Sequence, residues 1–158
     1  MEEKQQGQTG EIGKLNSPKL FMDGAITPSF IADNIGKHQR KTDIGAHSIF
    51  LGQVRADRVQ GASVVAIEYT AYEDLAIEGM KKIREELFAK HGLTCMHVYQ
   101  SLGVVSAGEI CLFVFTSSPH REAAITACNE MVERLKAELP IWGKELLSDE
   151  THQWKINK

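Results

Sequence analysis

The chain has 158 residues, of which 42% are hydrophobic and 25% charged, and its 18 Lys and Arg against 21 Asp and Glu give a formal net charge of -3. These values are typical of one globular domain and exclude collagen-like, coiled-coil and wholly disordered chains. The acidic excess argues against a general nucleic-acid or anionic-membrane binder, because binding to phosphates needs a surplus of Lys and Arg. Any basic site must therefore be local.

Cysteine usage and the chain start point to a cytoplasmic protein. Cys95, Cys111 and Cys128 lie inside apolar runs, which favours buried, reduced thiols. No apolar run approaches the roughly 18–20 residues of a membrane span, and the start of the chain does not resemble a signal peptide. We expect residues 1–18 to form a polar N-terminal tail and residues 19–158 to form a single domain.

The first half of the domain predicts an edge strand over residues 19–22, followed by a short helix with Thr27 as N-cap and Pro28 as its first residue. An apolar strand from Ala46 leads to Arg55. A second strand over residues 63–72 alternates with period two, with Val65, Ile67 and Tyr69 on one face. We expect these last two strands to pair as neighbours.

The second half predicts two helices separated by two strands. Leu75, Gly79, Ile83 and Leu87 recur every four residues and indicate an amphipathic helix. Strands follow at residues 96–102 and 110–115, the latter apolar enough to be central and covered on both faces. A long helix is expected to be capped by Ser118, with Pro119 at its start, and to stop at Pro140. Two short strands about the turn at residues 148–150 complete the chain.

This order predicts an α+β domain with helices on one side of a largely antiparallel sheet. The pattern fits several folds, including ferredoxin-like ones, and gives no function by itself.

One basic residue, Arg55, stands at the end of the first apolar strand, directly after Gln53 and Val54. The planar fork of an arginine binds phosphate or carboxylate. The alternative is an arginine that simply leaves the sheet into solvent.

A second basic pair, His120 and Arg121, falls in the predicted first turn of the long helix. Free backbone N–H groups and the helix dipole favour an anion there, and a basic pair at that end is itself unfavourable without one. The alternative is a cap followed by two exposed polar residues.

Lys136 lies beside the apolar stripe of the long helix. A partly desolvated lysine has a lowered pKa and can act as a nucleophile or proton carrier, although ordinary solvated lysines are far commoner. Trp142 is either a core anchor or the wall of a pocket, and Gly143 would let Lys144 turn back toward the helix end.

We expect no metal site and no cofactor. The histidines are scattered, with none at ligand spacing from another histidine or a cysteine. The chain contains no G-x-x-x-x-G-K-[ST], G-x-G-x-x-G or G-x-S-x-G motif, which argues against nucleotide, dinucleotide and serine-hydrolase functions. The hypothesis that is left is an anion-binding pocket formed by a few cationic side chains and an aromatic side chain.

Three segments, FLGQVR (50–55), TSSPHR (116–121) and LKAELPIWGKE (135–145), together resemble the large catalytic subunit of molybdopterin synthase over about residues 19–156. The resemblance implies a two-layer α/β-hammerhead-type fold with a small extra β subdomain. It also implies a homodimer that forms a heterotetramer with two small ubiquitin-like sulfur-carrier subunits. The implied reaction transfers sulfur from the thiocarboxylated C-terminal glycine of the carrier to cyclic pyranopterin monophosphate, and two transfers form the molybdopterin dithiolene.

The resemblance also implies roles for particular residues. Lys136 matches a catalytic lysine, and His120 and Arg121 match a pair that holds the substrate across the dimer interface. Where the family commonly has a second lysine, this chain has Gly143, so Lys144 is matched to that lysine by an offset of one residue. The resemblance thus implies Lys136 and Lys144 as catalytic residues and a substrate-binding set of Gln53, Val54, Arg55, His120, Arg121, Lys136, Gly143, Lys144 and Glu145.

Two other functions stay open at this point. One is a non-catalytic anion- or protein-binding α+β module. The other is an acyl-phosphate hydrolase on a ferredoxin-like fold, with Arg55 as the anion cradle. Lys136 distinguishes them, because hydrolysis of an acyl phosphate gives this lysine no role.

Overall fold

A computed structural model describes residues 19–157 and shows a mixed α/β fold. The apolar run of residues 110–115 lies in one of its most buried strands. The predicted tail, residues 1–18, lies outside the described residues. In chain order the elements are β1 (Phe21–Asp23), α2 (Pro28–His38), β2 (Ala46–Gln53), β3 (Arg58–Val59), β4 (Ala62–Ala71), α3 (Glu73–Lys90), β5 (Cys95–Ser106), β6 (Ile110–Ser118), α4 (Arg121–Glu138), β7 (Ile141–Leu147) and β8 (His152–Trp154).

The strands form one sheet in the order β2-β6-β5-β4-β7-β8, with β1 parallel to β5 and the other pairings antiparallel. The expectation that β2 and β4 pair is wrong: β2 pairs with β6, and β4 pairs with β5 and β7. The short strand β3 lies between β2 and β4 in the chain. A tight turn, in which Gln60 and Gly61 both adopt positive φ, joins β3 to β4. A connection of that kind pairs β4 with β3 and leaves β2 free to reach β6.

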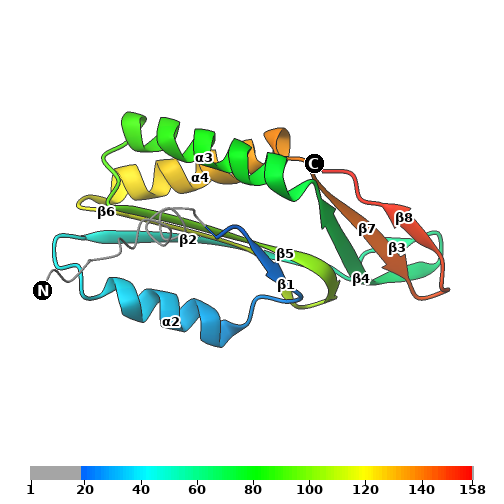
Figure 1. Cartoon of the computed structure of the whole chain (residues 1–158). Helices are drawn as coiled ribbons and strands as arrows, with labels where there is room; N and C mark the ends of the chain where they lie inside the picture. Colours follow the sequence, from blue (N-terminus) through cyan, green and yellow to red (C-terminus); the bar gives the residue numbers. More distant parts are fainter. Residues whose placement is uncertain (1–18, 158) are drawn as a thin grey trace, which may run out of the picture.

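Helices cover both faces of the sheet. Figure 1 shows α3 and α4 side by side over one face and α2 over the other. Met80 and Ile83 of α3 and Met131 and Leu135 of α4 belong to the main buried core. A smaller cluster around Phe113 and Phe115 lies under α2. From the sequence we expected the helices on one side of the sheet. This is true of α3 and α4 but not of α2.

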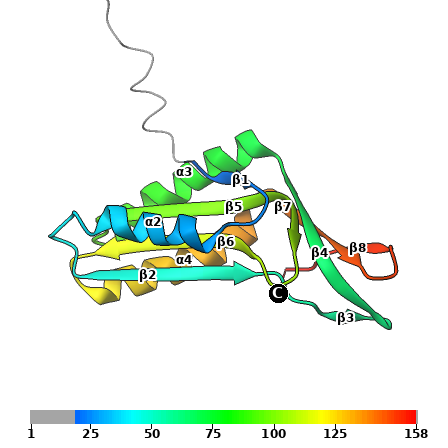
Figure 2. The same cartoon turned by 90° about the horizontal axis from the view of Figure 1, so that it is seen from below.

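One end of the sheet extends beyond the helical layers. Figures 1 and 2 show β3, β7, β8 and part of β4 projecting from the body as a smaller β region. Gly103, at φ +80°, lies where β5 passes from pairing with β1 and β6 to pairing with β4. The α+β class with a largely antiparallel sheet and a small added β region is therefore confirmed.

Three local expectations need correction. Val65 is 47% exposed, because the pairing of β4 with β7 shifts between Val64 and Ala66 and turns its side chain out of the alternation. Leu75 is also exposed, at 60%. The long helix begins at Arg121 with His120 as N-cap, because Ser118 is still the last residue of β6 and its hydroxyl donates to the His120 carbonyl.

Two helix ends agree with the sequence. The Thr27 hydroxyl accepts a hydrogen bond from the Phe30 amide at 3.2 Å, with Pro28 at the start of α2. Helix α4 ends at Glu138, before Pro140. Among residues 19–157, no helix is long and apolar enough to cross a bilayer.

Candidate functional site

A cleft of about 640 Å³ lies where the C-terminal part of α4 meets the β7–β8 hairpin and the end of β2. Its volume falls within the range of small-molecule sites. Four positions predicted from the sequence line it: Gln53 and Arg55 at the end of β2, Lys136 on α4, and Glu145 on β7. The backbone of Gly143 lines it as well. Segments far apart in the chain therefore meet around one cavity.

The cleft carries more positive than negative side chains. Arg55, Arg58, Lys136 and Lys155 line it, against Asp57 and Glu145. Arg55 contacts Asp57 at 3.1 Å, but its side chain is 79% exposed, and an exposed pair of this kind contributes little to stability. The guanidinium can therefore exchange Asp57 for an anionic ligand.

Lys136 has the environment expected of a reactive amine. The residue as a whole is exposed, but packing around the amine and the positive charge of Lys155 lower its pKa, against the smaller opposite effects of Cys111 and Glu133. The first cause is desolvation, which disfavours the charged form of an amine. More of Lys136 is therefore neutral, and able to act as a nucleophile or base, than of a solvated lysine.

Tyr69 and Cys111 form part of the cleft wall near this amine. Burial, together with Cys111 and the charge of Glu145, raises the pKa of Tyr69 far above its usual value. The phenol therefore stays protonated and can donate a hydrogen bond.

The two β7 residues at 143 and 144 face opposite sides of the strand. A Cβ atom on Gly143 would lie 2.9 Å from Ile67 Cγ2 and 3.2 Å from Tyr69 Cε1, so the Tyr69 ring and Ile67 occupy the space of a side chain there. Lys144 pairs in register with Glu68, and its amine lies 3.2 Å from the Glu68 carboxylate. Lys144 does not line the cleft.

Lys155 is one of the cleft residues that were not predicted from the sequence, together with Arg58, Tyr69 and Cys111. Its backbone amide donates to the Gly143 carbonyl at 2.8 Å, and its charge acts on Lys136. The predicted turn at residues 148–150 carried the signal, because a hairpin centred on Asp149 pairs residues equally distant from it. Gly143 and Lys155 are each six positions away (149 − 143 and 155 − 149).

Three other predicted residues lie apart from the cleft in this chain. Val54 is a core residue at 2% exposure. His120 and Arg121 are exposed at the N-terminal end of α4. Lys136 lies 15 residues after Arg121, which is about 22 Å along a helix. One chain alone therefore does not bring this basic pair to Lys136.

The expectation that no histidine stands at ligand spacing from another histidine or a cysteine is wrong in the folded chain. His38, Cys95 and His97 meet on the α2 side of the sheet, with ligand atoms all within 4.8 Å of one another. Cys95 and His97 are two positions apart on a strand, so their side chains point to the same face. That spacing was the available signal. None of the three lines the cleft.

The comparisons with known proteins point to the same family. The family model described as MoaE protein matches residues 27–138. The molybdopterin synthase catalytic subunits of Drosophila willistoni and Drosophila melanogaster are 43% and 37% identical to the chain over 116 and 125 residues, covering 72% and 77% of it. The matches cover 31% and 34% of those proteins, so the chain spans about a third of the length of these curated relatives.

Solved structures share the fold. A crystal structure of molybdopterin synthase from Staphylococcus aureus superposes with a TM-score of 0.73 at 26% identity, covering 87% of this chain and 96% of that one. A complex of subunits 1 and 2 of the molybdopterin-converting factor from Helicobacter pylori gives a TM-score of 0.74 at 19% identity, covering 88% and 90%. At that identity the second likeness concerns the fold alone.

Proposed function

The chain belongs to the MoaE protein family, and from this premise we propose that it is the catalytic subunit of a molybdopterin synthase, acting as a sulfurtransferase. Its sulfur donor is a small ubiquitin-like carrier with a thiocarboxylated C-terminal glycine, and its acceptor is cyclic pyranopterin monophosphate. A cytoplasmic location, expected from the sequence, is part of the proposal.

Each transfer breaks the bond between sulfur and the terminal carbonyl carbon of the carrier and forms a bond from sulfur to a carbon of the pterin, which gives up a bond to oxygen in exchange. The carrier leaves as a carboxylate whose additional oxygen comes from water. Two such transfers give the dithiolene. The protein has to bind an anionic substrate, position the acyl group and move protons.

The observation that carries the proposal is Lys136, an amine with a lowered pKa in a cleft that holds further cations. Such an amine can orient the acyl group, shuttle a proton or attack the carbonyl carbon, releasing sulfur and forming a transient isopeptide. Arg55, exposed and paired with Asp57, is suited to bind the substrate phosphate. Gln53 and Glu145 provide polar contacts in the same cleft.

We assign the second amine of the site to Lys155. Lys155 lines the cleft and lies near enough to Lys136 to affect its pKa. Lys144, matched to this role by a one-residue offset, contacts Glu68 and does not line the cleft. The family commonly has a lysine at the position of Gly143. In this chain Lys155, which pairs with Gly143 across the hairpin, takes that role.

His120 and Arg121 enter the proposal through a homodimer. Both are exposed at the end of α4 remote from Lys136, so a second copy of the chain is required to bring them to a cleft. In this arrangement each site takes Lys136 from one protomer and the basic pair from its partner.

A non-catalytic binding module remains the second candidate, because Gly143 stands where the family has a lysine. An acyl-phosphate hydrolase is disfavoured by the same cleft, since that reaction leaves Lys136 without a role.

Reconstitution tests the proposal. The purified chain is mixed with the thiocarboxylated carrier and cyclic pyranopterin monophosphate, and formation of the dithiolene product is measured. We expect turnover that Lys136→Ala lowers by at least about a hundredfold. Lys81→Ala, a change of an exposed lysine on α3, is the matched control. Absence of product with the wild-type chain favours the binding module, and full activity of Lys136→Ala would remove the role of this lysine.

A further inference from the structure

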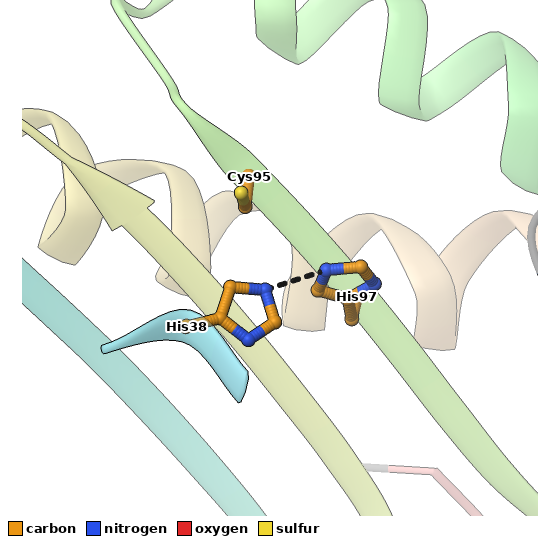
Figure 3. Close-up of side chains that lie close together, drawn as sticks. All are labelled: His38, Cys95 and His97. Atoms are coloured by element: carbon orange, nitrogen blue, oxygen red, sulfur yellow. Dashed lines mark hydrogen bonds between the residues drawn. The ribbon is translucent and has the colours of Figure 1, made fainter. Parts of the chain in front are cut away.

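Three side chains that bind transition metals converge between α2 and the beginning of β5, on the sheet face opposite α3 and α4. His38 comes from the last turn of α2, and Cys95 and His97 from one face of β5. Figure 3 shows the two imidazoles facing each other with the cysteine sulfur on the same side of the strand. We propose that His38, Cys95 and His97 form a binding site for a transition metal ion of the zinc type.

Hydrogen bonding directs the lone pair of His38 into the cluster. Nδ1 of His38 lies 2.7 Å from the carbonyl oxygen of Asn34. A carbonyl only accepts, so Nδ1 carries the proton and Nε2 presents its lone pair. Metal-ligating histidines are held in this way, with the second ring nitrogen donating to a carbonyl or carboxylate. Nε2 of His38 in turn lies 2.9 Å from Nε2 of His97.

The distances are close to those of a zinc site. Zinc bonds of about 2.0–2.1 Å to nitrogen place two imidazole nitrogens about 3.3 Å apart in a tetrahedral site, against the observed 2.9 Å. All three ligand atoms lie within 4.8 Å of one another. A bond of about 2.3 Å to sulfur requires the sulfur and nitrogen atoms to approach by about 1 Å. Rotation of the Cys95 side chain provides a movement of this size.

The ligand set and its surroundings favour a soft or borderline ion. One thiolate and two imidazoles are typical ligands of zinc and copper and poor ligands of calcium and magnesium. His38 and Cys95 are 7% and 5% exposed, and the His38 ring packs against Phe115 with centroids 4.8 Å apart. His97 is only half-buried, which leaves an approach for the ion and a fourth position for water.

Lys41 is the group that competes with the ion. Its amine donates a hydrogen bond to the Cys95 sulfur at 2.8 Å and so occupies a lone pair that a bound metal ion would need. Lys41 is exposed in the segment after α2, so its side chain can move into solvent when a cation binds. Removing this amine should therefore increase metal affinity, which would not be expected of an ion bound elsewhere on the surface.

The test is zinc binding by the reduced, metal-free full chain, measured in competition with a chromophoric chelator, and cobalt binding followed by thiolate-to-metal charge-transfer absorption. We expect one equivalent of zinc and a cobalt spectrum with that absorption. Cys95→Ser should abolish the absorption, and Cys95→Ser and His97→Gln should each weaken zinc binding by at least about a hundredfold, more than loss of an outer-shell partner costs. Lys41→Met should bind zinc more tightly than the wild type.

Two matched controls use the same residue types elsewhere in the fold. Cys128→Ser changes a buried free cysteine of α4, and His152→Gln an exposed histidine of β8; both should bind zinc within about twofold of the wild type. No stoichiometric zinc binding, or binding that survives Cys95→Ser and His97→Gln, would overturn the site. Because Lys41 is exposed, Lys41→Met is expected to fold, and unchanged or weaker zinc binding in this variant would also count against it. None of these measurements requires the sulfur-transfer reaction.

Discussion

The backbone amide of Lys155 donates a hydrogen bond to the carbonyl oxygen of Gly143 at 2.8 Å. This bond continues the β7–β8 pairing past Trp154 and fixes Lys155 beside the one β7 position whose side-chain space is filled by Tyr69 and Ile67. The lysine nearest in sequence, Lys144, contacts Glu68 instead. The second amine of the cleft is therefore supplied from across the hairpin.

Lys155→Ala is expected to lower the rate of dithiolene formation by about tenfold or more, because the change removes a cation that lines the cleft. Lys144→Ala should change the rate by less than about threefold, since this side chain makes a part-exposed ion pair outside the cleft. Both rates are measured in the reconstituted assay at saturating carrier. Equal losses in the two variants, or a larger loss in Lys144→Ala, would contradict the assignment of Lys155.

The pH dependence of Lys136 labelling depends on Lys155. Desolvation and, second, the positive charge of Lys155 lower the pKa of Lys136. In Lys155→Met the second effect is lost, so the pKa of Lys136 should rise and the neutral, reactive fraction at a given pH should fall. Labelling by an amine acylating reagent, followed by mass spectrometry across a pH series, should then show its midpoint at higher pH than in the wild type.

Lys144→Met provides the control for that experiment, because Lys144 is not among the causes of the Lys136 shift. A midpoint that stays in place or moves to lower pH in Lys155→Met would contradict a lowering of the Lys136 pKa by Lys155.

Gly143→Ala should destabilise the fold by about 1–3 kcal/mol, the usual cost of overpacking. The added Cβ would lie 2.9 Å from Ile67 Cγ2 and 3.2 Å from Tyr69 Cε1, so one of these side chains has to move. The free energy of unfolding is measured by denaturant titration. Gly36→Ala is the matched control: nothing lies within 4 Å of its added Cβ in α2, and loss of a helix glycine should stabilise by about 0.5–1 kcal/mol. Equal stability of Gly143→Ala and the wild type would refute this packing argument.

A site shared between protomers predicts complementation. Lys136→Ala and Arg121→Ala should each be nearly inactive alone, because each lacks one part of every site. When the two variants exchange subunits, half of the dimers are mixed and each mixed dimer holds one intact site. About a quarter of the wild-type rate should therefore return. The mixture is assayed after subunit exchange has been verified by co-purification of differently tagged chains, and a rate no higher than that of the separate variants would exclude a shared site.

The sequence by itself determined the local features of this protein. Hydrophobic periodicity predicted α3 and α4, and a continuous apolar run predicted β6. Thr27 with Pro28 marked the start of α2, and Pro140 marked the end of α4. Those signals come from neighbouring residues and therefore survive in any tertiary arrangement. The motifs also indicated Arg55 and Lys136, which the fold brings to one cleft.

Only the tertiary structure decided which distant groups meet. The pairing of β2 with β6 rather than β4, the position of α2 on the opposite face, and the meeting of His38 with Cys95 and His97 depend on contacts between segments far apart in the chain. Lys144 and Lys155 look alike in the sequence. Strand alternation turns Lys144 away from the cleft, and hairpin register brings Lys155 to it. A single-residue shift in either would reverse which of the two lysines lines the cleft, so spacing in the sequence alone does not decide it.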